Sequence, residues 1–264
     1  MNKTILQDVQ KQNDKRGIDI QKVGVNGVDV PLIIERKDAE NQTVSAKARL
    51  SVTLPHKYRG THMSRFIEVL SEYSRKNLLG VDIKGMLYDI RKKLESECAH
   101  AKFEFKYFIN KKAPVSGMEF PIGYDCSFQG DLEGDNYRFI LGVKVPITTL
   151  CPCSKEISKY SAHNQRTMVK VKVSYDEKDI IWIEDLIESI ESAGSSQIYS
   201  ILKRSDEKFV TEKAYENPKF VEDVLRDIIC MLKDNEKVTF YEVEVEAQES
   251  IHNHNAWAWQ SETK

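Results

Sequence analysis

The segment VSAKARLSVTLP, residues 44–55, alternates strictly between apolar and polar side chains. A period of two places the apolar side chains on one face of a β-strand and the polar ones on the other. This segment therefore predicts a half-buried strand. Further strands are predicted, by alternation or by short apolar runs, at residues 101–109, 117–130, 138–150, 166–175 and 238–247. Because short turns join several of these segments, we expect antiparallel pairing.

Apolar residues with helical spacing occupy the segments between the strands. They predict helices at residues 61–76, 82–97, 183–192 and 218–234. The order strand–strand–helix–helix–strand–strand thus occurs twice, as a repetition of pattern without clear identity between the halves. We predict an α+β protein with two similar units, residues 21–135 and 136–264, after a mobile or partner-docked arm at residues 1–20.

Composition excludes several classes of protein. The 264 residues include 39 Lys+Arg and 41 Asp+Glu, a formal net charge of −2, which argues against a general nucleic-acid binder. Five cysteines are an odd and sparse set, unlike a disulfide framework. The polar start has no apolar stretch for export, and no run approaches the length of a membrane span. We expect a soluble, reduced protein of the cytoplasm, bound to neither nucleic acid nor membrane.

One short segment is dense in reactive side chains. Cys151 and Cys153 are one residue apart, and His163 follows within the same stretch. One thiol can ligate a metal while the other faces a substrate. Two ordinary free cysteines at a strand end would give the same pattern, since Cys-x-Cys is not the usual spacing of structural zinc sites.

Three other segments are candidates for chemistry. Glu249 and His252 directly follow a predicted strand and suit metal ligation or proton transfer, although a solvated turn would look alike. Residues 56–65 are basic at a predicted helix start, which favours a phosphate-bearing ligand or simply a charged surface. Glu222 borders an apolar helical stripe. It lies either at the rim of the core or in a cleft, where a carboxylate can accept two hydrogen bonds from guanine.

Taken together, five segments resemble one known family. They are DVQKQNDKRGIDIQKVGV (8–25), RGTHMSRF (59–66), CPCSKEISKYSAHNQR (151–166), SDEKFVTEKAYENPKFVED (205–223) and ESIHNHNAWA (249–258). In this order and spacing they closely resemble the prokaryotic type IB GTP cyclohydrolase I family, over about residues 8 to 259. Two positions depart from the family pattern: Ser161 stands where glycine is expected, and residues 255–257 read Asn-Ala-Trp where Asp-Ala-Tyr is expected. We expect these departures to affect local packing more than activity.

The resemblance implies a tunnelling fold, with two units per chain that each pair an antiparallel sheet with two helices. Such chains assemble into barrels, here a homotetramer with active sites at the subunit interfaces. The implied reaction converts GTP and water to 7,8-dihydroneopterin triphosphate and formate. That reaction is the first step toward both tetrahydrofolate and the queuosine tRNA nucleoside.

The resemblance also implies roles for individual residues. A divalent metal, with zinc, manganese or iron as candidates, would be held by Cys151, His163 and Glu207. Cys153 resembles a second active-site thiol, and Glu249 and His252 resemble acid/base residues. Glu222 resembles the carboxylate that anchors guanine. For the triphosphate, the resemblance favours His62 and Arg65, with Arg59 and Lys203 as further candidates.

Two other functions remain open at this point. One is another tunnelling-fold enzyme that acts on a pterin or deazapurine with Cys153 as covalent nucleophile. The other is a metal-stabilised binding module, which would unfold when its metal is removed.

Overall fold

The computed structural model describes residues 8–78 and 80–264. Within these residues the chain divides into two compact units. Unit 1 comprises residues up to Glu35, then Glu40–Phe105 and Phe128–Phe139, and unit 2 comprises Arg36–Ala39, Lys106–Ser127 and Ile140–Lys264. Three long strands, β4 (Cys98–Lys112), β5 (Glu119–Glu133) and β6 (Asn136–Leu150), contribute residues to both units.

Unit 1 contains a sheet in the strand order β3-β1-β2-β4. The strands are β1 (Ile20–Ile34), β2 (Gln42–Leu54), the short β3 (Asn77–Leu78) and the first part of β4. β2 pairs antiparallel with β1 and with β4, while β3 runs parallel to β1. The apolar side chains of β2 are buried and most of its polar ones are exposed, which confirms the predicted strand.

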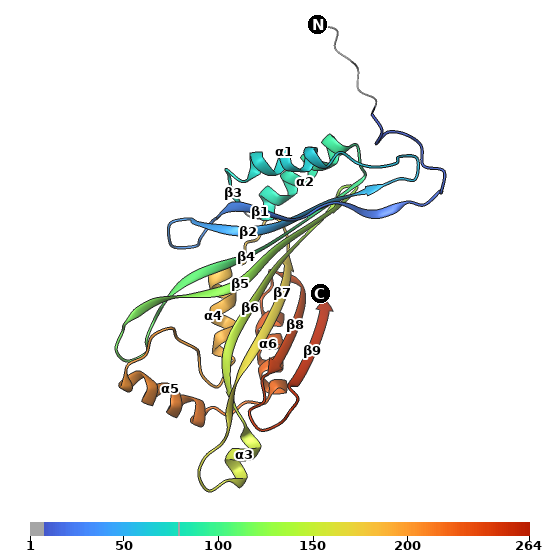
Figure 1. Ribbon diagram of the computed structural model, residues 1–264. Coiled ribbons are helices and arrows are strands. Elements are labelled where there is room, and N and C mark those ends of the chain that lie inside the picture. The colour runs from blue at the N-terminus through green and yellow to red at the C-terminus, as the bar shows by residue number, and fades with distance from the viewer. Residues whose placement is uncertain (1–7, 79) are drawn as a thin grey trace. The chain divides into compact units, whose positions relative to one another are not determined.

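Two helices complete unit 1. They are α1 (Met63–Tyr73) and α2 (Gly80–Leu94), which contact each other and lie together beside β1 and β2 (Figure 1). α1 buries Phe66, Val69, Leu70 and Tyr73, the stripe that helical spacing predicts. The Tyr73 hydroxyl donates a hydrogen bond to Asp89 Oδ2 of α2 at 2.7 Å, so a polar contact joins the two helices.

Unit 2 contains the antiparallel strand order β6-β7-β8-β9. Its further elements are α3 (Pro152–Ile157), β7 (Asn164–Tyr175), α4 (Ile183–Ser192), α5 (Arg204–Glu216), α6 (Val221–Asp234), β8 (Val238–Ala247) and β9 (Ala256–Thr263). α6 packs against β8 and contacts α4 (Figure 1). The opposite residues of β7 and β8 form ion pairs, Lys170–Glu244 and Lys172–Glu242, each at 2.7 Å. This sheet therefore has an apolar face and a charged face.

The structure confirms the α+β class and every strand and helix that the sequence predicted, with shifts of a few residues at their ends. Five elements were not predicted individually: β1, β3, α3, α5 and β9. The twofold repeat and the boundaries at residues 20 and 135 stay predictions. In the described part of the chain, we find no helix of the length and hydropathy that a membrane span requires.

The predicted N-terminal arm is described from residue 8 onward, and residues 1–7 lie outside the described residues. Within unit 1 the described part contacts the segment before α1. The backbone N–H of Arg59 donates to the Gln12 carbonyl at 2.8 Å, and that of Gly60 donates to the Gln10 carbonyl at 3.2 Å. Residues 10–12 are thus held by backbone hydrogen bonds to the same chain.

Candidate active site

A cavity of about 510 Å³ in unit 2 gathers six of the residues predicted to act in catalysis or binding. They are Cys151, Cys153, His163, Glu222, Glu249 and His252. The cavity is also lined by polar or aromatic residues to which the sequence analysis gave no role: Gln165, Lys219, His254 and Trp257. Its size falls within the range of pockets that bind small molecules.

The two thiols lie at the start of α3 and differ in their surroundings. Cys151 is the N-cap of this helix, with extended backbone, and Pro152 follows at the first helical position, where its missing N–H costs little. The Cys151 sulfur accepts the Ser154 backbone N–H at 3.5 Å. Cys151 is half-buried, whereas Cys153 is exposed. One thiol is therefore held by the helix start while the other is free to meet a ligand.

His163 directly precedes β7 and is held beside Cys151 by the backbone. The Cys151 N–H donates to the His163 carbonyl at 3.1 Å. This bond continues the β6–β7 ladder, in which Leu150 pairs with Asn164. Residues 151–163 therefore leave the sheet and return to the same place. That excursion explains how a thiol and an imidazole separated in sequence come to line one cavity.

Glu222 enters the same cavity from the start of α6. Phe220 is the N-cap, and its backbone N–H donates to Asp223 Oδ2 at 3.0 Å. The preceding Lys219 donates its N–H to the Leu150 carbonyl at 3.1 Å. This bond ties the helix start to the end of β6, next to Cys151. Glu222 is exposed and lines the cavity, and its role as a ligand-binding carboxylate stays a prediction.

The segment between β8 and β9 supplies the remaining polar side chains. Its start is fixed by the Gln248 N–H, which donates to the Arg166 carbonyl at 2.9 Å. Beyond this anchor Glu249 is half-buried and His252 is exposed. The rings of His252 and His254 stack with their centroids 5.2 Å apart. His254 was part of the segment that drew attention in the sequence, but nothing in its spacing separated it from a solvated turn.

The two departures from the family pattern have different structural consequences. Ser161 has a φ of +113°, a backbone conformation that residues other than glycine rarely adopt. This explains why glycine is expected at this position. This departure acts on the local backbone, as expected. Trp257 lines the cavity, so the second departure changes the wall of the site itself.

Glu207, the predicted third metal ligand, does not line this cavity. It lies in the first turn of α5, where its N–H donates to the Lys203 carbonyl at 2.9 Å. The neighbouring Asp206 is fully buried and accepts hydrogen bonds from Ser116 and from the N–H groups of Val115 and Lys203. Asp206 thus fixes α5 to the β4–β5 turn.

Within residues 8–78 and 80–264, no three His, Cys, Asp or Glu side chains converge closely enough to hold a metal ion. The role of Glu207 as a ligand therefore stays a prediction. Cys151 and His163 remain suitable donors, because thiolate and imidazole are the ligand types that zinc and iron prefer.

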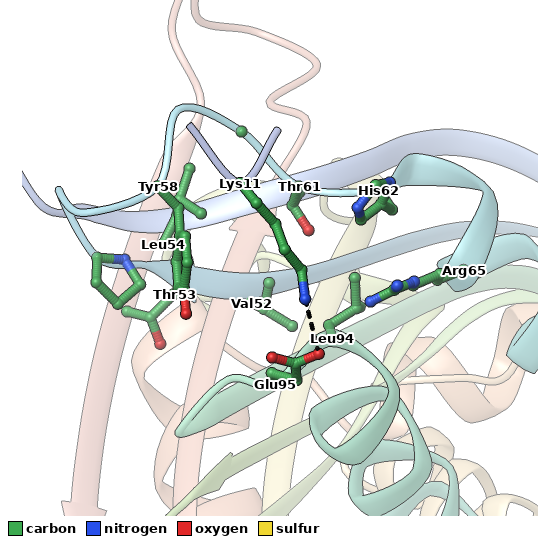
Figure 2. Close-up of a pocket in the computed structure, with 12 residues that line it drawn as sticks. Lys11, Val52, Thr53, Leu54, Tyr58, Thr61, His62, Arg65, Leu94 and Glu95 are labelled. Atoms are coloured by element: carbon green, nitrogen blue, oxygen red, sulfur yellow. Dashed lines mark hydrogen bonds and ion pairs between the residues drawn. The ribbon is translucent and has the colours of Figure 1, made fainter. Parts of the chain in front are cut away.

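The predicted triphosphate residues His62 and Arg65 lie in unit 1, around a cavity of only about 30 Å³ (Figure 2). His62 Nε2 lies 3.3 Å from Asp8 Oδ2. Arg65 donates to the Lys93 carbonyl in the last turn of α2 at 2.8 Å, which places a cation at the negative end of that helix. Arg65 has a hydrogen-bond partner within unit 1, whereas the buried His62 Nε2 makes no hydrogen bond there, and the role of both residues in phosphate binding stays a prediction.

Solved structures with a similar fold identify the fold class. The uricase from Bacillus fastidious has a TM-score of 0.57 and 7% identity, covering 92% of this chain and 93% of that chain. The uricase from Arthrobacter globiformis has a TM-score of 0.54 and 6% identity, with the same coverage. At such low identity the likeness concerns the fold alone. It confirms that the chain is a tunnelling-fold protein.

Sequence comparison then identifies the family. The model of the family described as type I GTP cyclohydrolase folE2 matches residues 6–258. A protein named GTP cyclohydrolase FolE2 from Geotalea uraniireducens (strain Rf4) is 51% identical, covering 96% of this chain and 92% of its own. Those from Geobacter sulfurreducens and Thermosipho africanus are each 48% identical, over 96% of both chains. The chain belongs to the type I GTP cyclohydrolase FolE2 family, a family of hydrolases, as its motifs predicted.

Proposed function

We propose that this chain hydrolyses GTP at purine C8 within the unit 2 cavity and releases formate and 7,8-dihydroneopterin triphosphate. The observation that carries the proposal is the convergence of two thiols, two carboxylates and several imidazoles on that one cavity. They come from four separate places: the α3 start, the β7 start, the α6 start and the segment before β9. Core packing alone gives no reason for so many titratable side chains to share one concave surface.

Glu222 binds the guanine edge in this proposal. Its carboxylate can accept two parallel hydrogen bonds, one from N1–H and one from the 2-amino group. Its place in the first turn of α6 supports this role, because the helix dipole favours a negative charge there. The base is thereby oriented inside the cavity, with C8 on the side away from Glu222.

Cys151 and His163 are the residues that would hold a divalent metal, with Glu207 as the proposed third ligand. When bound, such a metal supplies a water whose pKa is lowered to about 7, which provides a nucleophile at neutral pH. Zinc, manganese and iron(II) all remain candidates. The half-buried Cys151 thiol and the adjacent imidazole support a site with an open side toward the cavity.

Glu249 and His252 move protons in this proposal. Ring opening requires a proton at a purine nitrogen, and the later ribose rearrangement requires both an acid and a base. Both side chains line the cavity, Glu249 half-buried and His252 exposed, and both lie in one short segment anchored at Gln248. The exposed Cys153 thiol faces the same space and is a further group near the reacting centre.

The proposal also covers the triphosphate contacts, which lie outside the unit 2 cavity, and the assembly of the chain. We assign the phosphate contacts to His62 and Arg65, with Arg59 and Lys203 as additional cations. The proposed assembly is a homotetramer with barrels and interface sites, acting in the cytoplasm, where five free thiols persist. Light scattering of the purified protein tests the tetramer. The product would feed both folate and queuosine synthesis.

The activity test uses protein freed of metal with a chelator, then GTP with Mn²⁺ or Zn²⁺. Formate release and the fluorescence of the oxidised pterin should appear together. Cys151→Ser should abolish both, whereas Cys230→Ser should leave them unchanged, because Cys230 is exposed on α6 and does not line the cavity. Absence of formate with every divalent metal would refute the proposed reaction.

A further inference from the structure

Gln165 lies on the cavity wall between the proposed metal-binding histidine and two buried hydroxyls. His163 directly precedes β7, and Gln165 and Thr167 follow it at alternate positions, so the three side chains project to the same face of the extended chain. Thr149 of β6 is the direct cross-strand partner of Gln165. The four side chains therefore form a row that leads from the sheet interior to the cavity.

Hydrogen bonds connect this row without a gap. Thr149 and Thr167 are at most 1% exposed, and their hydroxyl oxygens lie 2.7 Å apart. The Gln165 amide NH₂ donates to Thr149 Oγ1 at 3.3 Å. The amide oxygen of Gln165 then faces His163 Nδ1 at 3.0 Å. The NH₂ group is thus used on the buried side, which leaves the carbonyl oxygen for the imidazole.

The carbonyl oxygen determines which ring nitrogen of His163 carries the proton. An amide oxygen can only accept, so the hydrogen bond at Nδ1 requires an Nδ1–H donor. Ser250 Oγ lies 3.3 Å from the same nitrogen and can also accept from it. In the neutral imidazole the other nitrogen, Nε2, then keeps its lone pair. A metal-binding histidine needs this arrangement, in which the second nitrogen donates to an oxygen outside the metal site.

We infer that Gln165 is a positioning residue that holds His163 in the Nδ1–H tautomer and presents Nε2 as a ligand to a divalent cation. This inference rests on the proposed metal-binding role of His163. The Thr149–Thr167 pair orients the Gln165 amide, so its carbonyl cannot turn away without losing a bond to a buried hydroxyl. A tautomer fixed before the cation arrives removes one cost of binding.

The first test is spectroscopic and does not depend on activity. Metal-free protein labelled with ¹⁵N-histidine is studied by long-range ¹H–¹⁵N correlation, and a His163→Gln sample assigns the ring among the six histidines. Wild-type His163 should show a protonated Nδ1 and an unprotonated Nε2. Gln165→Leu should shift the ring toward a mixture of tautomers, and Gln165→Glu, which keeps an acceptor, should restore the Nδ1–H form. A wild-type spectrum with Nε2–H would overturn the inference.

The second test measures zinc affinity by competition with a chromophoric chelator. Gln165→Leu should weaken Zn²⁺ binding by about 10- to 100-fold, the range seen for lost outer partners of ligating histidines. Gln165→Glu should bind Zn²⁺ with the affinity of the wild type. Gln260→Leu makes the same chemical change at an exposed position of β9 and should have no effect.

The outcomes separate this inference from the proposed function. Wild-type zinc affinity in Gln165→Leu, together with a large loss in Cys151→Ser and His163→Gln, would refute the role of Gln165 alone. Unchanged affinity in His163→Gln would refute the ligand role of His163, and with it the presentation of Nε2 to the cation.

Discussion

Lys111 of β4 and Glu191 of α4 form an ion pair in the interior of unit 2. Replacing either residue should destabilise the protein, and the stability of the two variants should change with pH in opposite directions. Lys111 Nζ lies 2.6 Å from Glu191 Oε1, with side chains only 12% and 6% exposed. Tyr124 donates its hydroxyl hydrogen to the same carboxylate oxygen at 2.7 Å. Burial lowers the pKa of Lys111, and the attraction of Glu191 offsets part of that shift.

The perturbation is a cycle of near-isosteric substitutions: Glu191→Gln, Lys111→Met and both together. Removing one partner of a buried pair leaves the other charge without compensation, which typically costs about 3–5 kcal/mol. The remaining group can limit this cost by becoming neutral. In Glu191→Gln, deprotonating a lysine of ordinary pKa near 10.4 costs about 3 kcal/mol at pH 8. In Lys111→Met, protonating a glutamate of ordinary pKa near 4.3 costs about 5 kcal/mol at the same pH.

The signs follow from proton binding. In Glu191→Gln the unfolded lysine binds more protons than the folded one, so stability rises with pH and the deficit shrinks by about 1.4 kcal/mol per pH unit. In Lys111→Met the folded carboxyl binds more protons than the unfolded one. Stability therefore falls as pH rises, and the deficit grows until it equals the cost of the unpaired buried charge, about 3–5 kcal/mol. The double substitution removes both charges and keeps an amide oxygen for Tyr124, so it should cost less than about 1.5 kcal/mol at every pH.

The assay is urea unfolding, followed by circular dichroism at pH 7, 8 and 9. All samples should have one protein concentration, because assembly adds to apparent stability. The double variant should be more stable than either single variant at pH 8. If its deficit equals the sum of the two single deficits, or if neither single deficit changes with pH, the two charges are not buried together as the structure places them.

Three further predictions concern single positions. Ser161→Gly should raise the free energy of unfolding by about 1 kcal/mol, because it removes the strain at φ +113°; no gain in urea midpoint would contradict this. Gly24→Ala should destabilise by about 3 kcal/mol or more, since its Cβ would lie 2.0 Å from a carbonyl oxygen of β2, while Gly60→Ala, with its nearest atom at 3.7 Å, should unfold as wild type does. His100→Ala should destabilise the protein at neutral pH but progressively less below about pH 4. Burial by itself would raise the pKa of Asp131, yet the hydrogen bond from His100 at 2.6 Å helps hold that pKa below its usual value. The stabilisation from this bond is lost as Asp131 becomes protonated. A deficit that stays constant down to pH 3 would refute the last prediction.

The elements that could be predicted from the sequence are those with one buried face and one solvated face. β2, β7 and β8 alternate because the sheet has one apolar face, and α1, α4 and α6 carry apolar stripes for the same reason. α5 was missed because it buries only Asp206 and Ala214 and so has no apolar stripe. α3 has six residues, too few for a periodic pattern. β9 exposes Trp257 and Trp259, which removes the usual contrast between its faces.

The candidate site was predictable where motifs carry chemistry and unpredictable where tertiary contacts decide. Six motif residues do share a cavity, but spacing along the chain does not encode whether Glu207 reaches it. Gln165 could have been found, because a period of two from His163 leads directly to it. Trp257 was seen as a departure from the family pattern, yet only the structure shows that it lines the cavity.

The register of the strands in unit 2 determines whether this site exists at all. Three backbone hydrogen bonds assemble it: Cys151 to His163, Lys219 to Leu150, and Gln248 to Arg166. Each begins or ends at a residue beside the β6–β7 ladder, so one end of the sheet orders Cys151, the start of α6 and the segment before β9 together. A slip of one residue in β7 would turn His163 and Gln165 to the opposite face. The apolar alternation of Val169, Val171 and Val173, all buried, prevents that slip, because it would expose all three valines. These three valines therefore hold the proposed catalytic groups in register, although none of them lines the cavity.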